Sequence, residues 1–189
     1  MIVTTLLGYF ILLVFFYAER RLRRGDAARI PQDAPSDRRT TRYVGMAYGI
    51  SLLALLAAWV LNALHVGGLP EWVAALGVFV ALCGLFMRTW ANRVLGRFYA
   101  RTLRVAEGQK ILQDGQYRTI RHPGYLGMIL MWTGASAATA NWIVLLVVLL
   151  VILAAYHYRI QSEEKMLEGT LPGYAEYRSH TWRLIPLIY

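Results

Sequence analysis

Two polar clusters flank one long apolar stretch, and their residue types suit the handling of a charged small molecule. The first cluster, residues 115–127, contains Arg121 and His122, and the second, residues 159–167, contains an arginine followed by two adjacent glutamates. If the apolar stretch folds as a helical hairpin, both clusters meet at one membrane face. Ionisable groups at a lipid boundary are costly to place there, so we expect the resulting pocket to be functional.

Each cluster also has a purely structural interpretation. Arg159 and Glu163 lie one helical turn apart on the same face, where an ion pair contributes only roughly 0.2–0.5 kcal/mol. His122 before Pro123 suits a charged cap at a helix entry, because proline is tolerated at the first helical position. The four histidines show no spacing typical of zinc sites, and the single cysteine excludes an intramolecular disulfide.

The elements that must position these clusters are membrane helices. The chain has 189 residues, of which 57% are hydrophobic, with a mean hydropathy of +0.40, whereas soluble domains are about 45–50% apolar. The excess lies in long runs, which predicts an all-α polytopic membrane protein with one domain, residues 1–189. We predict five transmembrane helices, the last two forming a C-terminal hairpin, at about residues 2–17, 43–64, 72–91, 124–139 and 142–158.

Charge then predicts the orientation of these spans. The net charge is +9, and with five spans all 20 Lys and Arg residues fall on one side of the membrane. The positive-inside rule makes that side cytoplasmic, with the N-terminus outside and the C-terminus and the pocket inside. The positive charge also suits anionic lipid headgroups or an anionic substrate. We do not expect nucleic acid as a partner, because the arginines cluster at the ends of the spans. We interpret residues 20–42 as a loop or a frayed helix end, and we expect this segment to take little part in the chemistry.

The ordered segments of the C-terminal half resemble the isoprenylcysteine carboxyl methyltransferase family of integral membrane enzymes. The resemblance covers roughly residues 85–189. The matching elements, in chain order, are Arg88-Thr-Trp90, Leu95-Gly96, Gly115-Gln-Tyr117, Arg121-His122-Pro123-Gly-Tyr125-Leu-Gly127, Glu163-Glu164, Tyr174-Ala-Glu-Tyr177 and Arg183-Leu-Ile-Pro186.

The resemblance implies S-adenosyl-L-methionine as the methyl donor, held in a cytosolic pocket. By position it places donor contacts at Gln109, Lys110, Ile111, Leu112, Tyr117, His122, Pro123, Gly124, Tyr125 and Glu163. The family usually has histidine where Gln109 stands, so this chain departs from the pattern there. The resemblance also implies that Arg159 contacts the acceptor, and we add Arg88 and Trp90 as predicted acceptor contacts.

The residue types fit these roles. Glu163 suits the ammonium group of the donor, since a buried charge needs an opposite partner. Tyr117 or Tyr125 suits the adenine ring or the sulfonium, and Arg159 suits an acidic oxygen of the acceptor. An ionised acceptor needs no strong base, so alignment and exclusion of water would supply most of the rate. A hydroxyl acceptor would need a base, for which His122 and Glu164 are the candidates.

The sequence leaves several functions open. The leading hypothesis is O-methylation of a carboxylate or hydroxyl on an isoprenoid or other lipid-like acceptor that enters from the bilayer. A phospholipid N-methyltransferase would share the cofactor and the hairpin, and a non-enzymatic membrane scaffold would explain the spans but not the gathered polar residues. The expected partners are the bilayer and the acceptor, with no metal and no nucleic acid. The small residues of the second and third spans would allow a homodimer.

Overall fold

The secondary structure is helical throughout the described residues, which confirms the predicted all-α class. The computed structural model describes residues 2–22, 37, 39–96 and 111–189. Within them lie α1 (Ile2–Leu22), α2 (Thr40–Ala63), α3 (Glu71–Leu95), the short 3-10 helix η4 (Gly115–Arg118), α4 (Pro123–Ala137), α5 (Trp142–Thr170) and α6 (Tyr174–Ser179), and no strand.

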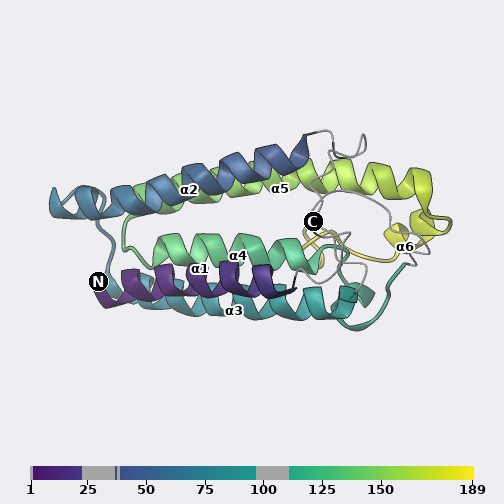
Figure 1. Cartoon of the computed structure of the whole chain (residues 1–189), viewed down its shortest axis with the longest axis horizontal. Helices are drawn as coiled ribbons and strands as arrows, with labels where there is room; N and C mark the ends of the chain where they lie inside the picture. The colour runs from purple at the N-terminus through teal and green to yellow at the C-terminus, as the bar shows by residue number, and fades with distance from the viewer. Residues whose placement is uncertain (1, 23–36, 38, 97–110) are drawn as a thin grey trace.

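The five long helices form a bundle of two layers. Figure 1 shows α2 and α5 side by side in one layer and α1, α3 and α4 in the other. The start of α1, the α2–α3 connection and the α4–α5 turn gather at one end, which we call the turn end. The extension of α5, helix α6 and the C-terminus lie toward the opposite end, which we call the polar end.

Four helices are long and apolar enough to cross a membrane: α1, α2, α3 and α5. Helix α4 has 15 residues and is therefore about 23 Å long, shorter than the roughly 30 Å of bilayer hydrocarbon. Most of its side chains are buried against neighbouring helices, so it does not meet lipid as the other four do. The number of spans, predicted as five, stays a prediction.

Close contact between α3 and α4 holds one layer together. Four glycines lie on the contact, namely Gly77 and Gly84 on α3 and Gly127 and Gly134 on α4. A Cβ atom at any of them would come under 3.0 Å from the backbone of the facing helix. Such small residues allow helices to pack backbone to backbone in lipid, where no hydrophobic effect drives association. The small-residue faces expected to permit a homodimer are thus partly used within the chain.

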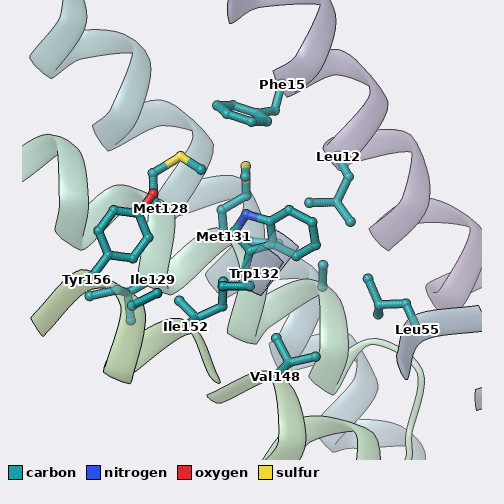
Figure 2. Packing of buried hydrophobic residues seen from close by; sticks show 14 of the residues in the cluster. Leu12, Phe15, Leu55, Met128, Ile129, Met131, Trp132, Val148, Ile152 and Tyr156 are labelled. Atoms are coloured by element: carbon teal, nitrogen blue, oxygen red, sulfur yellow. The ribbon is translucent and has the colours of Figure 1, made fainter. Parts of the chain in front are cut away.

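A tryptophan on α4 fills the space between the two layers. Trp132 is fully buried, and its ring stacks on Tyr48 of α2 with 5.0 Å between centroids. Figure 2 shows Trp132 surrounded by aliphatic, aromatic and methionine side chains from α1, α2, α4 and α5, among them Leu12, Phe15, Leu55, Val148 and Ile152. This core fixes the position of α4 relative to the α2–α5 layer. The start of α4 is therefore held at a fixed place beside α5.

The turn end is closed by one asparagine. The Asn141 side-chain oxygen accepts hydrogen bonds from the amides of Ile143 and Val144, which caps α5. Its Nδ2 donates to the side chain of Asn62 and to the carbonyl of Val66, so the α2–α3 connection is tied to the same residue. The predicted turn between the last two spans is therefore held in place by side-chain hydrogen bonds of Asn141.

Helix α5 extends well past its apolar sequence. The apolar run ends near Tyr158, but the helix continues to Thr170 and carries the second polar cluster on its extension. The chain then turns at Gly173, whose φ of +82° favours glycine, and enters α6. This extension places the glutamates beyond the apolar part of the bundle, at the polar end.

Candidate functional site

The two polar clusters meet at the polar end of the bundle. His122 Nε2 lies 3.3 Å from Glu164 Oε1, and His122 Nδ1 lies 3.7 Å from Glu163 Oε2. His122 is 6% exposed and Glu164 is 3% exposed, so this contact is inside the protein. The hairpin predicted from the sequence is confirmed by these distances.

The local sequence explains the position of His122. Pro123 occupies the first position of α4, and the residue before a proline avoids helical geometry. His122 accordingly has φ −123° and ψ 53°, and its carbonyl accepts hydrogen bonds from the amides of Tyr125 and Leu126. Pro123 and Gly124, two predicted donor contacts, are buried in this first turn.

Glu164 binds three cationic or titratable groups. Arg121 Nε donates to its Oε1 at 2.9 Å, and Arg183 Nε donates to its Oε2 at 3.0 Å, with Arg183 Nη2 also 3.0 Å from Oε2. His122 Nε2 is the third partner. Both carboxylate oxygens therefore have partners, and charge-assisted bonds of this kind hold their groups in fixed geometry. The arrangement supports an anchoring role for Glu164.

The C-terminal tail is part of this anchor. The amides of Arg121 and His122 donate to the carbonyls of Trp182 and Arg183 at 2.7 and 3.1 Å, and the Trp182 amide donates to Thr119 at 2.9 Å. Arg121 Nη1 also donates to the carbonyls of Arg178 and Thr181. A segment more than 55 residues downstream thus fixes the entry of α4. The sequence did not predict that the tail lies here, because backbone hydrogen bonds between two irregular segments produce no periodic pattern of side chains.

Arg159 is buried and binds groups from two other elements. Its Nε donates to the Tyr125 hydroxyl at 2.9 Å, and its Nη1 donates to the hydroxyls of Thr40 and Thr41 at 3.2 Å each. Asp37 Oδ1 lies 3.9 Å from the same Nη1. The expectation that residues 20–42 carry little chemistry was wrong at their C-terminal end, because α2 begins beside the site and its first hydroxyls bind the arginine.

Tyr125 lies between the histidine and the arginine. Its ring stacks on His122 at 5.5 Å between centroids with 10° between planes, and the Arg159 guanidinium lies 5.8 Å from its centroid. The ring of Tyr156 on α5 is tilted against it, at 5.0 Å between centroids. Because Tyr125 is half-buried, part of its ring stays available to a ligand. An aromatic ring that is partly exposed suits contact with an adenine ring or a sulfonium.

Glu163 offers an unused acceptor atom. Its side chain is 24% exposed, and its Oε2 is buried without a hydrogen-bond partner among the described residues. A buried carboxylate oxygen without a donor is unfavourable and fits a missing cation. The ammonium of an amino-acid-like ligand is a suitable partner, so the residues present fit the expected methyl donor.

Two other predicted donor contacts lie beside α6. Tyr117 is buried, and its carbonyl accepts a hydrogen bond from the Tyr177 hydroxyl at 2.6 Å. Burial raises the pKa of Tyr177 to about 12, so this hydroxyl stays protonated and donates at neutral pH. Ile111 packs against the cluster of Leu167, Tyr174 and Tyr177. Leu112 is half-buried.

Gln109 and Lys110 lie outside the described residues, so their predicted contacts stay predictions.

The two further acceptor predictions, Arg88 and Trp90, lie on the last turns of α3 and stay predictions. Arg88 donates to Glu19 Oε1 through Nε and Nη2, and its Nη1 would lie 3.0 Å from a Cβ at Gly124, at the start of α4. Trp90 is 43% exposed, its ring contacts Phe86, and it would lie 3.9 Å from a Cβ at Gly115. Sequence reasoning missed Glu19, although it is the one carboxylate in the basic segment that ends the first span.

Among the described residues, no group of three His, Cys, Asp or Glu side chains could hold a metal ion. The site is instead built from paired charges, hydroxyls and aromatic rings.

The chain resembles known membrane methyltransferases in sequence. Residues 75–169 match the model of the isoprenylcysteine carboxyl methyltransferase (ICMT) family. Protein-S-isoprenylcysteine O-methyltransferase B of Arabidopsis thaliana is 23% identical over 146 residues, which cover 75% of this chain and 74% of that protein. A probable protein-S-isoprenylcysteine O-methyltransferase of Oryza sativa subsp. indica is 27% identical over 119 residues, 61% of this chain and 62% of that protein.

The fold is also similar to a solved structure. The eukaryotic intramembrane Ras methyltransferase ICMT superposes with a TM-score of 0.66 at 18% identity, and the match covers 94% of this chain and 64% of that one. The chain thus spans less than two thirds of the solved protein's length. The family match covers half of this chain, including α3, α4, most of α5 and the polar cluster between them. This chain belongs to the isoprenylcysteine carboxyl methyltransferase family.

Proposed function

We propose that this chain transfers a methyl group from S-adenosyl-L-methionine to a carboxylate or hydroxyl oxygen of a lipophilic acceptor, at the polar end of the bundle. The chain is a multi-pass membrane protein of a methyltransferase family. The observation that carries the proposal is the Glu163 Oε2 atom, which makes no hydrogen bond among the described residues and lies 3.7 Å from His122 Nδ1, at the end of an apolar helical bundle. These groups complement a cationic donor on one side and an anionic acceptor on the other.

Donor binding is assigned to the residues nearest Glu163. Its carboxylate would accept the ammonium, and the half-buried Tyr125 ring would pack on the adenine or face the sulfonium. Pro123, Gly124 and the backbone of residues 109–112 would complete the pocket around Tyr117. When bound, the donor supplies an electrophilic methyl group on its sulfonium sulfur, and the protein's task is to align an oxygen with it.

Acceptor orientation is assigned to Arg159, with Arg88 nearby. A guanidinium matches the geometry of a carboxylate, and Arg159 is held by Tyr125 and two threonines so that little ordering remains to be done on binding. The relatives' names specify a prenylated cysteine, whose carboxylate is already ionised at neutral pH and needs no general base. The lipid part of the acceptor would stay in the bilayer, against the exposed apolar faces of the helices.

His122 and Glu164 are assigned to positioning. Glu164 uses both oxygens to hold Arg121, Arg183 and His122, which leaves it poorly placed to remove a proton. His122 in turn stacks on Tyr125 and thereby fixes the ring that faces the donor. A base would be needed only for a neutral hydroxyl acceptor, and His122 remains the candidate for that case.

The donor assignment is tested by calorimetry on purified chain in detergent, titrated with S-adenosylhomocysteine. Wild-type protein should bind, and Glu163→Gln should weaken binding at least ten-fold, because the amide cannot neutralise the ammonium. Glu168→Gln is the matched control, since Glu168 lies on the same helix but is exposed and pairs with Arg178. Absence of binding by wild type would contradict the function, and unchanged binding by Glu163→Gln would contradict only the site.

The acceptor class is tested with native membranes and a donor carrying a labelled methyl group. We expect lipid-extractable label that is released by mild base, as methyl esters are. Base-stable label would instead indicate a phospholipid N-methyltransferase or a methyl ether product. Arg159→Gln should abolish labelling while leaving donor binding measurable, which separates the acceptor contact from the donor contacts.

A further inference from the structure

A second hollow lies beside the site, on the surface of the C-terminal segment. Its volume is about 430 Å³, and it is lined by Arg121, Arg178, Ser179, His180, Thr181, Trp182, Arg183 and Tyr189. None of the lining residues is acidic. His122, Tyr125, Arg159 and Glu163 do not line it, so it is separate from the place proposed for donor and acceptor.

The charges around the hollow favour an anion. Arg121 and Arg183 share one buried carboxylate, Glu164, and Arg178 pairs with Glu168 on the surface. Three arginines of the lining thus pair with two carboxylates, Glu164 and Glu168. His180 is exposed at the rim.

The hollow lies at the level where the apolar part of the bundle ends. The Tyr189 hydroxyl contacts His157 Nδ1 at 3.0 Å, and His157 is near the last apolar turn of α5. Leu184 is buried in the main core between the layers. These two contacts fix the tail against the membrane-crossing bundle, so its polar groups lie at headgroup depth.

The tail presents apolar side chains beside this basic hollow. The amide of Leu184 donates to the Tyr189 carbonyl at 2.8 Å and the amide of Tyr189 donates to Ile185 at 3.0 Å, which closes a tight loop. Leu187 is 84% exposed with φ of +69°, and Ile188 is 77% exposed. The loop thus turns two large apolar side chains outward, next to an anion-binding surface, which is the pattern of a membrane-interface anchor.

We propose that the hollow binds the phosphate of an anionic phospholipid from the surrounding bilayer, while Leu187 and Ile188 insert among its acyl chains. Arg178 supplies a charge and His180 a ring nitrogen for the lipid phosphate, and Trp182 and Tyr189 lie at the headgroup layer as such rings commonly do. The continuity with the lipid-facing surface of the bundle favours a bilayer lipid over a soluble phosphate. The bound lipid would hold the tail on Arg121 and His122, and so support the site.

The test uses the full chain in nanodiscs of equal phosphatidylglycerol and phosphatidylcholine, followed by detergent washing and mass spectrometry of the retained lipid. Wild type should retain phosphatidylglycerol in preference, by about five-fold for each basic residue engaged. The double variant Arg178→Gln with His180→Gln should reduce this preference by about five-fold or more relative to wild type. Arg93→Gln is the matched control, because Arg93 is an exposed arginine in the last turn of α3, outside the hollow.

Two further measurements separate the alternatives. Leu187→Asn should weaken lipid retention without unfolding the loop, since asparagine tolerates a positive φ better than leucine does. Glycerol phosphate at millimolar concentration should not displace the lipid, and displacement would assign the site to a soluble phosphate. A preference that survives the double variant, or falls equally in Arg93→Gln, would overturn the proposal. Binding of S-adenosylhomocysteine, measured on the same samples, reports separately on the proposed function.

Discussion

At the residue scale, the site depends on one buried carboxylate that several cationic groups share. Glu164 links α5 to the entry of α4 through Arg121 and His122, and to the tail through Arg183. Burying these charges is costly, and the hydrogen bonds offset the cost only while every group has its partner. Glu163, one residue earlier, differs because one of its oxygens lacks a hydrogen-bond partner among the described residues. Adjacent glutamates thus serve two purposes, one structural and one suited to a ligand.

Replacing this shared carboxylate should destabilise the fold and the site together. Glu164→Gln leaves the buried Arg121 without its counter-charge, which typically costs about 3–5 kcal/mol, and removes the partner of the partly exposed Arg183. We expect a lower midpoint of thermal unfolding in detergent, together with weaker binding of S-adenosylhomocysteine.

The control for this prediction is Glu168→Gln on the same helix. Its exposed pair with Arg178 should contribute only about 0–1 kcal/mol. If both variants unfold at the wild-type temperature, the clustered bonds around Glu164 do not stabilise the protein as we infer.

At the element scale, the position of His122 depends on how closely α3 and α4 approach. Helix α4 is short and buried, and its glycines let it lie against the backbone of α3. Gly127 lies one turn after His122, and a Cβ there would come 2.6 Å from the Arg88 amide nitrogen. The same contact therefore sets the distance between the α4 entry and the Arg88–Glu19 pair.

A single added methyl group should disrupt this packing. Gly127→Ala forces the α3 and α4 backbones apart, since no flexible side chain can yield, and overpacking of this kind costs about 1–3 kcal/mol. The thermal unfolding midpoint in detergent should fall, and donor binding should weaken.

Gly45→Ala on α2 is the matched control for this substitution. Nothing lies within 4 Å of its added Cβ, and alanine stabilises a helix by about 1 kcal/mol relative to glycine. That variant should unfold at or above the wild-type temperature. Equal behaviour of the two variants would show that the backbone contact is unimportant.

At the scale of the whole molecule, the bundle separates an uncharged end from a basic one. The turn end contains residues 64–70 and 140–141, which include no Lys or Arg, while the polar end contains the site and the hollow. The positive-inside rule predicts that such a bundle has its turn end outside and its polar end in the cytoplasm. A cytoplasmic site would have direct access to a soluble donor and lateral access to a lipid acceptor.

This orientation is checked by cysteine labelling. In a Cys83→Ala background, Val66→Cys at the turn end should react with a membrane-impermeant maleimide in intact cells. Lys165→Cys, which is exposed at the polar end, should react only after the cells are permeabilised. The reverse pattern would place the site outside and would contradict the proposed orientation.

The sequence by itself determined the class of the fold and the centre of the site. Hydropathy and charge are local properties, and they placed the long helices within a few residues of their observed bounds, except where α5 continues past its apolar run. A turn this short between two apolar runs forces the two helices to run antiparallel, side by side. The contact between His122 and Glu163 could therefore be predicted from the order of the segments along the chain.

Only the tertiary structure decided which groups complete that site. The partners of Arg159 on α2, the Glu19 partner of Arg88, and the tail segment that pairs with Ile120 all come from distant segments. Such contacts depend on how whole helices pack, and that packing is set by glycine contacts and by Trp132 between the layers rather than by any local pattern. For this reason the sequence identified the charged residues, and the fold assigned each charge its partner.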